Sequence, residues 1–178
     1  MKDGVHPTLA MAVDPERMER ILERDKQEIE IEKETEKLES IFSTPSKKKE
    51  KIEIISRISR KYYELANGMV EDSQYSEAID LYTKSIAMLR KAGNKKAVDS
   101  YFNRAIALAM MGYPKVALDD LKAITSVKPP KADFYFVKGQ ILESIGKEKL
   151  AAKMYKKSLD IDPGFYRATN SLEHMRLR

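Results

Sequence analysis

Residues 98–131 read VDSYFNRAIALAMMGYPKVALDDLKAITSVKPPK, and residues 132–165 read ADFYFVKGQILESIGKEKLAAKMYKKSLDIDPGF. Aligned without a gap, the two segments lie 34 residues apart and place the same residue types at matching positions. The matched pairs are Tyr101 with Tyr135, Leu108 with Leu142, Gly112 with Gly146, Ala117 with Ala151, and Pro129 with Pro163. Self-similarity at one fixed spacing indicates a repeat, in which each unit is one piece of supersecondary structure.

Each unit predicts two antiparallel helices. The Tyr and the Leu two turns later form the inward stripe of the first helix. The Gly ends that helix where a left-handed residue is wanted, and the Ala lets the second helix approach closely. The Pro then ends the unit. An earlier copy lies 39 residues upstream of the first quoted segment, with Tyr62, Ala78 and Tyr82 in the places of Tyr101, Ala117 and Leu121.

With these residues the chain resembles the tetratricopeptide-repeat family. The first unit departs from the family pattern by having Ser73 in place of the hinge Gly and Arg90 in place of the Pro. Ala66 and Ala105 stand where Gly139 keeps the small Gly of the family. The resemblance implies an all-α fold with three helix hairpins in a right-handed superhelical stack. Within residues 47–165 these hairpins are expected at 59–97, 98–131 and 132–165, followed by a capping helix at 166–178.

Residues 1–46 are expected to hold a flexible start, a long charged helix and a linker. Asp14-Pro15-Glu16 reads as a helix start, and the helix should run to about Phe42. Its apolar residues do not keep a heptad register, which favours a solvated helix resting partly on the body. A helix for self-association or for a partner, and disorder, are the alternatives. We expect the repeat body to fold without residues 1–45.

Composition narrows the function classes. The net charge is +5, with 42% hydrophobic and 34% charged residues and no Cys, so disulfides and thiolate metal sites are excluded. His6 and His174 lie far apart, and no Gly-rich phosphate loop occurs. We therefore expect no enzyme activity, cofactor or metal. No apolar run reaches a membrane-spanning length, and we expect an intracellular protein, in the cytoplasm or alternatively in the nucleus.

The resemblance also implies a binding surface, because the first helix of each tetratricopeptide unit lines a concave groove. The expected groove residues are Arg60, Tyr63, Glu64, Asn67, Asp99, Phe102, Asn103, Ile106, Met110, Asp133, Phe136, Val137 and Gln140. Arg60 would be their only cation. This balance favours an apolar or basic segment of a partner protein over an acidic one. Any of Tyr63, Phe102 and Phe136 could instead be an ordinary packing residue.

Many family members bind the acidic tails of heat-shock chaperones with a clamp of Lys, Asn, Asn, Lys and Arg. Here the two Asn positions are Asn67 and Asn103, but the cationic positions hold Tyr63, Asp133 and Val137. Without these cations the charge-assisted hydrogen bonds to a carboxylate are missing. A scaffold or adaptor with another ligand is therefore favoured over a chaperone adaptor.

Two further partner hypotheses remain alternatives. Lysines expected on the second helices could bind nucleic acid or another acidic surface, although an exposed, solvated face is the simpler interpretation: Lys95, Lys96, Lys115, Lys147, Lys149, Lys153, Lys156 and Lys157. Binding to phosphates would weaken steeply with salt. The charged N-terminal helix could also mediate self-association.

Overall fold

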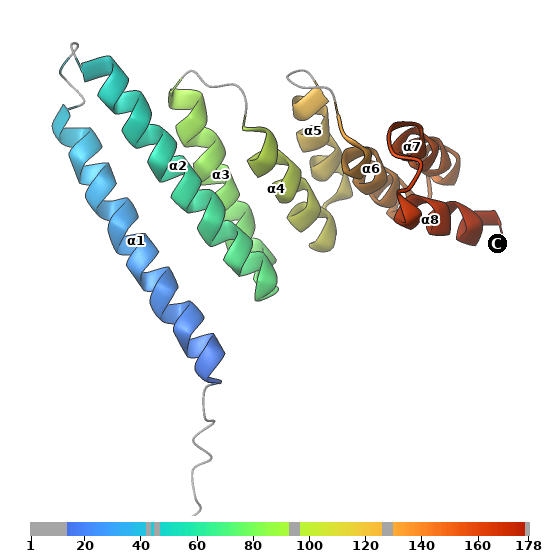
Figure 1. Cartoon of the computed structure of the whole chain (residues 1–178), viewed down its shortest axis with the longest axis horizontal. Helices are drawn as coiled ribbons and strands as arrows, with labels where there is room; N and C mark the ends of the chain where they lie inside the picture. Colours follow the sequence, from blue (N-terminus) through green and yellow to red (C-terminus); the bar gives the residue numbers. More distant parts are fainter. Residues whose placement is uncertain (1–13, 42–43, 45–46, 93–96, 126–129, 177–178) are drawn as a thin grey trace, which may run out of the picture.

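The computed structural model describes residues 14–41, 44, 47–92, 97–125 and 130–176. These residues form eight α-helices and no strand, which confirms the all-α expectation (Figure 1). The helices are α1 (Pro15–Ile41), α2 (Lys48–Glu71), α3 (Tyr75–Lys91), α4 (Val98–Met110), α5 (Pro114–Thr125), α6 (Ala132–Ser144), α7 (Glu148–Ile161) and α8 (Tyr166–Arg176). Pro129 and the lysines at 95 and 96 lie outside the described residues, as does the expected flexible start.

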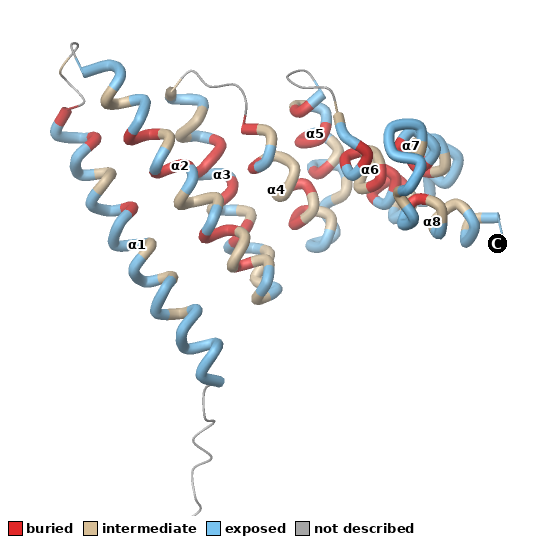
Figure 2. Tube along the Cα trace, viewed as in Figure 1, coloured by how far each residue is buried: buried red, intermediate tan, exposed pale blue. Residues whose placement is uncertain are grey.

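Neighbouring helices run antiparallel, and the pairs α2–α3, α4–α5 and α6–α7 follow one another along the molecule (Figure 1). Helix α1 packs at one end of the stack and α8 at the other. From α2 to α7 the buried residues lie on the sides turned toward neighbouring helices, whereas the N-terminal half of α1 holds only exposed and intermediate residues (Figure 2). The core is therefore a series of layers, each closed only by its neighbours.

The turns inside the three helix pairs share one geometry. Ser73, Gly112 and Gly146 have positive φ values of 58°, 81° and 74°. In each turn the next residue donates its N–H to the carbonyl five residues earlier, as from Tyr113 to Leu108 at 2.8 Å, which is the bond of a Schellman motif. Ser73 therefore adopts the left-handed conformation of the glycine it replaces, and the absence of Gly does not disturb the turn.

Small residues bring the paired helices together. Ala78, Ala117 and Ala151 are fully buried early in the second helices, as the repeat pattern predicts. The bulky residue one turn later in each unit (Tyr82, Leu121 or Tyr155) is also buried. In the third pair, Tyr155 lies directly against Gly139 of α6. A methyl group built on Gly139 would lie 2.4 Å from the Tyr155 ring.

We expect Gly139→Ala to destabilise the protein by about 1–3 kcal/mol, because it overpacks this contact. The Tyr155 ring cannot turn aside freely, since its hydroxyl donates a 2.7 Å hydrogen bond to Glu143. Urea unfolding of the full chain measures the change. The control is Gly68→Ala in α2, where an added methyl group has no atom within 4 Å. Equal stability of the two variants would contradict the close packing of α6 on α7.

Helix α1 is part of the core and does not only rest on the body. Its Ile31, Leu38 and Ile41 are buried in one cluster with Ile54 and Ile58 of α2. The repeat body therefore shares its apolar surface with α1, which speaks against the reason given for expecting it to fold without residues 1–45. The predicted long charged helix is confirmed, and in addition it covers the apolar face of α2.

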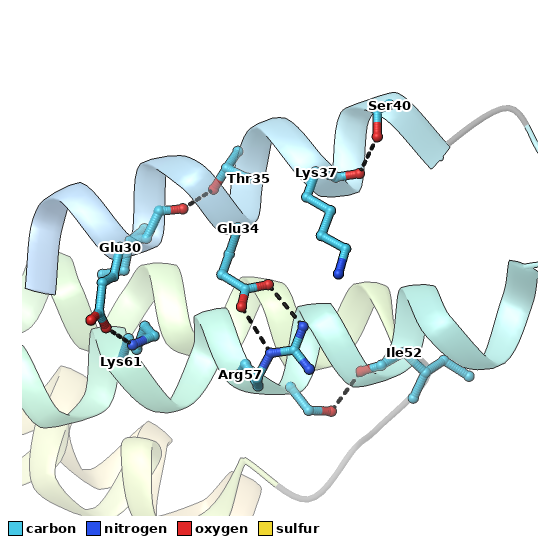
Figure 3. Close-up of polar contacts among 10 residues, drawn as sticks. Glu30, Glu34, Thr35, Lys37, Ser40, Ile52, Arg57 and Lys61 are labelled. Carbon is cyan, nitrogen blue, oxygen red and sulfur yellow. Dashed lines mark hydrogen bonds and ion pairs between the residues drawn. The ribbon is translucent and has the colours of Figure 1, made fainter.

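Ion pairs flank this contact between α1 and α2 (Figure 3). Arg57 donates two hydrogen bonds to the Glu34 carboxylate at 3.0 and 2.9 Å, and Lys61 pairs with Glu30. Hydrogen bonding to Arg57 holds the pKa of Glu34 below its usual range, and Lys61 does the same for the pKa of Glu30. Both carboxylates therefore stay ionised at neutral pH and keep α1 in register on α2.

Candidate functional site

Two adjoining hollows open between the first helices of the three pairs. The first has a volume of about 230 Å³ and is lined by Asn67, Val70, Glu71, Tyr82, Asn103 and Ile106. The second, of about 450 Å³, is lined by Phe102, Ile106, Ala109, Met110, Asp133, Phe136, Val137, Gln140, Ile141, Ser144 and Arg167. Ile106 lines both, so we treat the two hollows as one groove along α2, α4 and α6.

The groove brings together most of the residues predicted from the sequence. Those that line it are Asn67, Phe102, Asn103, Ile106, Met110, Asp133, Phe136, Val137 and Gln140. Asp99 lies with Phe102 and Asp133 in a smaller neighbouring hollow that also contains Lys131. Arg60, Tyr63 and Glu64 do not line the groove in the described part of the chain, and Arg60 and Glu64 are exposed on α2.

A closed hydrogen-bond network forms the α2 end of the groove. Asn103 Nδ2 donates to the Tyr63 hydroxyl at 3.1 Å and to Asn67 Oδ1 at 3.0 Å. Tyr82 donates its hydroxyl proton to the same Asn67 oxygen at 2.7 Å. Burial raises the pKa of Tyr82 to about 12, so this phenol remains a donor at neutral pH. Both amide protons of Asn103 are thus used within the protein.

The middle of the groove is apolar. Phe102, Ile106 and Val137 are half-buried and Met110 is exposed, so each of them can contact a ligand. Phe136 differs, because it is only 3% exposed and packs against the rings of Tyr155 and Phe165. Phe136 therefore belongs mainly to the core between α6, α7 and α8. Of the three aromatic residues whose function was left open, Phe136 and Tyr63 are packing residues. Tyr63 does not line the groove, packs against the Tyr82 ring and accepts a hydrogen bond from Asn103.

The groove residues predicted from the sequence did not include a cation that lies at the α8 end of the groove. The guanidinium of Arg167 lies 4.5 Å from the centroid of the Phe136 ring, and Arg167 lines the same hollow as Asp133. The expectation that Arg60 is the only cation is therefore wrong, since Arg60 does not line the groove while Arg167 does. The repeat spacing contained the signal: Arg167 is 34 residues after Asp133, which is 34 after Asp99.

The described lysines of the predicted basic face are exposed on or beside the second helices. Lys115, Lys147, Lys149, Lys153, Lys156 and Lys157 all belong to this group. Lys157 lies over the ring of Tyr135, 5.4 Å from its centroid. Among the described residues, no group of His, Cys, Asp or Glu is arranged to hold a metal ion. None of the described helices combines the length and the hydrophobicity needed to cross a bilayer.

Comparison with known proteins agrees with the fold. Residues 132–165 match the family model described as tetratricopeptide repeat. Over 103 residues the chain is 33% identical to serine/threonine-protein phosphatase T of Trypanosoma brucei brucei (strain 927/4 GUTat10.1), covering 58% of this chain and 21% of that protein. It is also 29% identical over 97 residues to small glutamine-rich tetratricopeptide repeat-containing protein 2 of Mycosarcoma maydis. That match covers 54% of this chain and 26% of the relative.

A solved structure is similar over most of this chain. The first tetratricopeptide domain of Spaghetti (RPAP3), bound to the HSP90 peptide SRMEEVD, superimposes with a TM-score of 0.61 at 24% identity. The match covers 68% of this chain and 93% of that one. At this identity the likeness shows the fold. The chain spans about a quarter or less of the length of the two curated relatives.

Proposed function

We propose that this chain, which has the tetratricopeptide-repeat fold and carries such a repeat at residues 132–165, is a non-catalytic interaction module. It holds a segment of a partner protein in the groove between α2, α4 and α6. The observation that carries the proposal is the continuous apolar floor of Phe102, Ile106 and Val137, all half-buried and open to a ligand. A concave apolar surface with a few polar groups at its ends is the usual form of a binding site.

The ends of the groove define the chemistry of the ligand. At the α2 end Glu71 lines the groove, and towards α8 both Asp133 and Arg167 line it. Two carboxylates and one guanidinium favour a ligand with apolar residues in the middle and a basic residue on at least one side. An extended peptide or one face of a helix meets this requirement. As scaffold or adaptor, the chain would act inside the cell, in the cytoplasm or alternatively in the nucleus; its lack of Cys is compatible with a reducing compartment.

Ile106→Gln should weaken ligand binding at least about tenfold, because a polar group would be placed at the centre of the apolar floor. The ligands for this test are peptides selected from a displayed random library on the intact chain. The matched control is Val116→Gln on α5, since Val116 is exposed and lies outside the groove. Calorimetric titration compares the two variants. Peptides that bind both equally well would locate the binding site elsewhere.

A second candidate function is binding of an acidic chaperone tail. Two observations favour it: the likeness to a domain solved with an HSP90 peptide, and the presence of Asn67 and Asn103 at the matching positions. The geometry argues against it. Asn103 donates both amide protons to protein oxygens, and Asp133 would repel a carboxylate. We therefore rank this candidate below an apolar or basic ligand.

The peptide SRMEEVD should bind the wild-type chain no more tightly than about 1 mM. Tyr63→Lys, Asp133→Lys and Val137→Arg together should improve its affinity at least about tenfold, since a charge-assisted hydrogen bond contributes about 1.5–3 kcal/mol. Replacing Tyr63 also releases one amide proton of Asn103 for the ligand. Micromolar binding to the wild type that Asn67→Ala abolishes would make the chain a chaperone adaptor.

A further inference from the structure

A second hollow, separate from the groove, is lined by residues of α1, which runs alongside α2, and by residues of α2 and α3. Its volume is about 770 Å³, and its lining comes from all three helices. The floor is apolar and includes Ile29, Tyr62, Leu65 and Leu81. Ile29 is 51% exposed, although it belongs to the helix that covers α2. We call this hollow the α1 cleft.

One wall of the α1 cleft is strongly acidic. Five carboxylates of α1 line it: Asp25, Glu28, Glu32, Glu36 and Glu39. Their successive spacings are 3, 4, 4 and 3 residues, so they form a single stripe on the helix. The stripe spans about 21 Å at the rise of an α-helix. The opposite wall has one cation, Lys84, which lies over the Tyr62 ring.

The stripe is not needed to hold α1 in place. The carboxylates that dock α1 are Glu30 and Glu34, which pair with Lys61 and Arg57 on another face of the helix (Figure 3). Within the described residues none of the five cleft carboxylates forms an ion pair. An isolated row of like charges on one helix face disfavours the helix. Within the described residues the stripe therefore adds no ion pair that would dock α1 on α2.

We propose that the α1 cleft docks a basic amphipathic helix of a partner protein, about four turns long. Its apolar face would cover Ile29, Tyr62 and Leu81, and its lysines or arginines would face the carboxylate stripe. Charge complementarity of this kind sets the choice and orientation of a partner. The match is local, because the whole chain has a net charge of +5 and would otherwise repel a basic ligand.

A synthetic helix of leucine and lysine tests the proposal, with leucines on one face and a length of about four turns. Its counterpart has glutamate in place of every lysine. The full-length chain should bind the basic peptide with micromolar affinity at low salt, and bind the acidic one at least about tenfold more weakly. Binding of the basic peptide should weaken as salt is raised. Absence of binding, or equal binding of both peptides, would overturn the proposal.

Matched charge reversals locate the contact. The double substitution Glu32→Lys with Glu36→Lys should weaken binding of the basic peptide at least about tenfold. Glu16→Lys with Glu19→Lys changes the net charge equally on the same helix but outside the cleft, and should change affinity less than about threefold. Ile29→Gln should also weaken binding, whereas Ile106→Gln, which tests the groove, should not. Equal effects of the two double reversals would show that only the overall charge matters.

Two other occupants of the α1 cleft are possible in principle, namely residues 1–13 of the chain and a second copy of it, and each predicts a different experimental result. If the peptide binds only after residues 1–13 are deleted, the chain's own start fills the cleft and the proposal fails. If the wild type sediments as a dimer that Glu32→Lys with Glu36→Lys dissociates, the occupant is a second copy and the proposal also fails. A monomer that binds the basic peptide with and without residues 1–13 supports a basic helix from a partner.

Discussion

Removing residues 1–46 should unfold or aggregate the remaining chain under conditions in which the full chain is folded. The deletion takes away the buried side chains of Ile31, Leu38 and Ile41. Burial of each contributes about 1.5–3 kcal/mol, and a domain is stable by only about 5–15 kcal/mol. The deletion also exposes the apolar face of α2, including Ile54 and Ile58. Circular dichroism and sedimentation of the truncated chain measure both consequences.

Two substitutions on α1 in the full-length chain test the packing of α1 on α2 without shortening the chain. Leu38→Ala should destabilise the full chain by about 2–5 kcal/mol, because Leu38 is buried against α2. Leu22→Ala, at an exposed position of the same helix, should change stability by less than about 0.5 kcal/mol. A folded, monomeric 47–178 fragment together with a neutral Leu38→Ala would mean that α1 is a dispensable appendage.

The contribution of α1 to the core could not be derived from its sequence pattern. Only Ile31, Leu38 and Ile41 are buried, while Met18, Leu22 and Ile29 of the same helix are exposed. A regular apolar stripe is what sequence reasoning detects, and here the buried residues occupy one end of a mainly charged helix. These three side chains are buried because the apolar face of α2 lies opposite them. That face belongs to a different helix, so the sequence of α1 alone does not reveal the contact. Removal of a terminal layer from a repeat stack exposes the same kind of surface.

The repeat pattern, by contrast, predicted the turns correctly, whereas the groove residues followed only from the resemblance to the tetratricopeptide-repeat family. The 34-residue spacing predicted where Gly112 and Gly146 end their helices, and carried to α8 it would also have found Arg167. Spacing gives position along a helix but not burial. Phe102 and Phe136 occupy the same place in successive units, yet Phe102 is half-buried and Phe136 is buried. The difference comes from Phe165, which covers Phe136 and has no counterpart above Phe102 in the described core contacts.

A buried ion pair was also beyond the reach of sequence reasoning. Arg104 of α4 and Asp120 of α5 are 16 residues apart, and only the packing of the two helices brings them together. Nε and Nη2 of Arg104 donate to the two carboxylate oxygens at 2.8 and 2.7 Å, and Nη1 donates to the Thr83 hydroxyl of α3 at 2.8 Å. One guanidinium thus ties three helices from two repeat units.

Arg104→Ala should destabilise the protein by about 3–5 kcal/mol, because it leaves the carboxylate of Asp120 buried without its cation. The Asp120 side chain is only 7% exposed, so water cannot replace the lost partner fully. Arg104→Met with Asp120→Leu should recover most of the loss, since apolar residues of similar size often replace a buried ion pair at little cost. The stability of Arg104→Lys should lie between those of the wild type and Arg104→Ala, because an ammonium keeps the charge but cannot make the bidentate contact. Urea unfolding of the four chains measures the series. A loss below about 1 kcal/mol for Arg104→Ala would mean that solvent reaches Asp120 and that the layer between the first two repeat units is looser than these contacts imply.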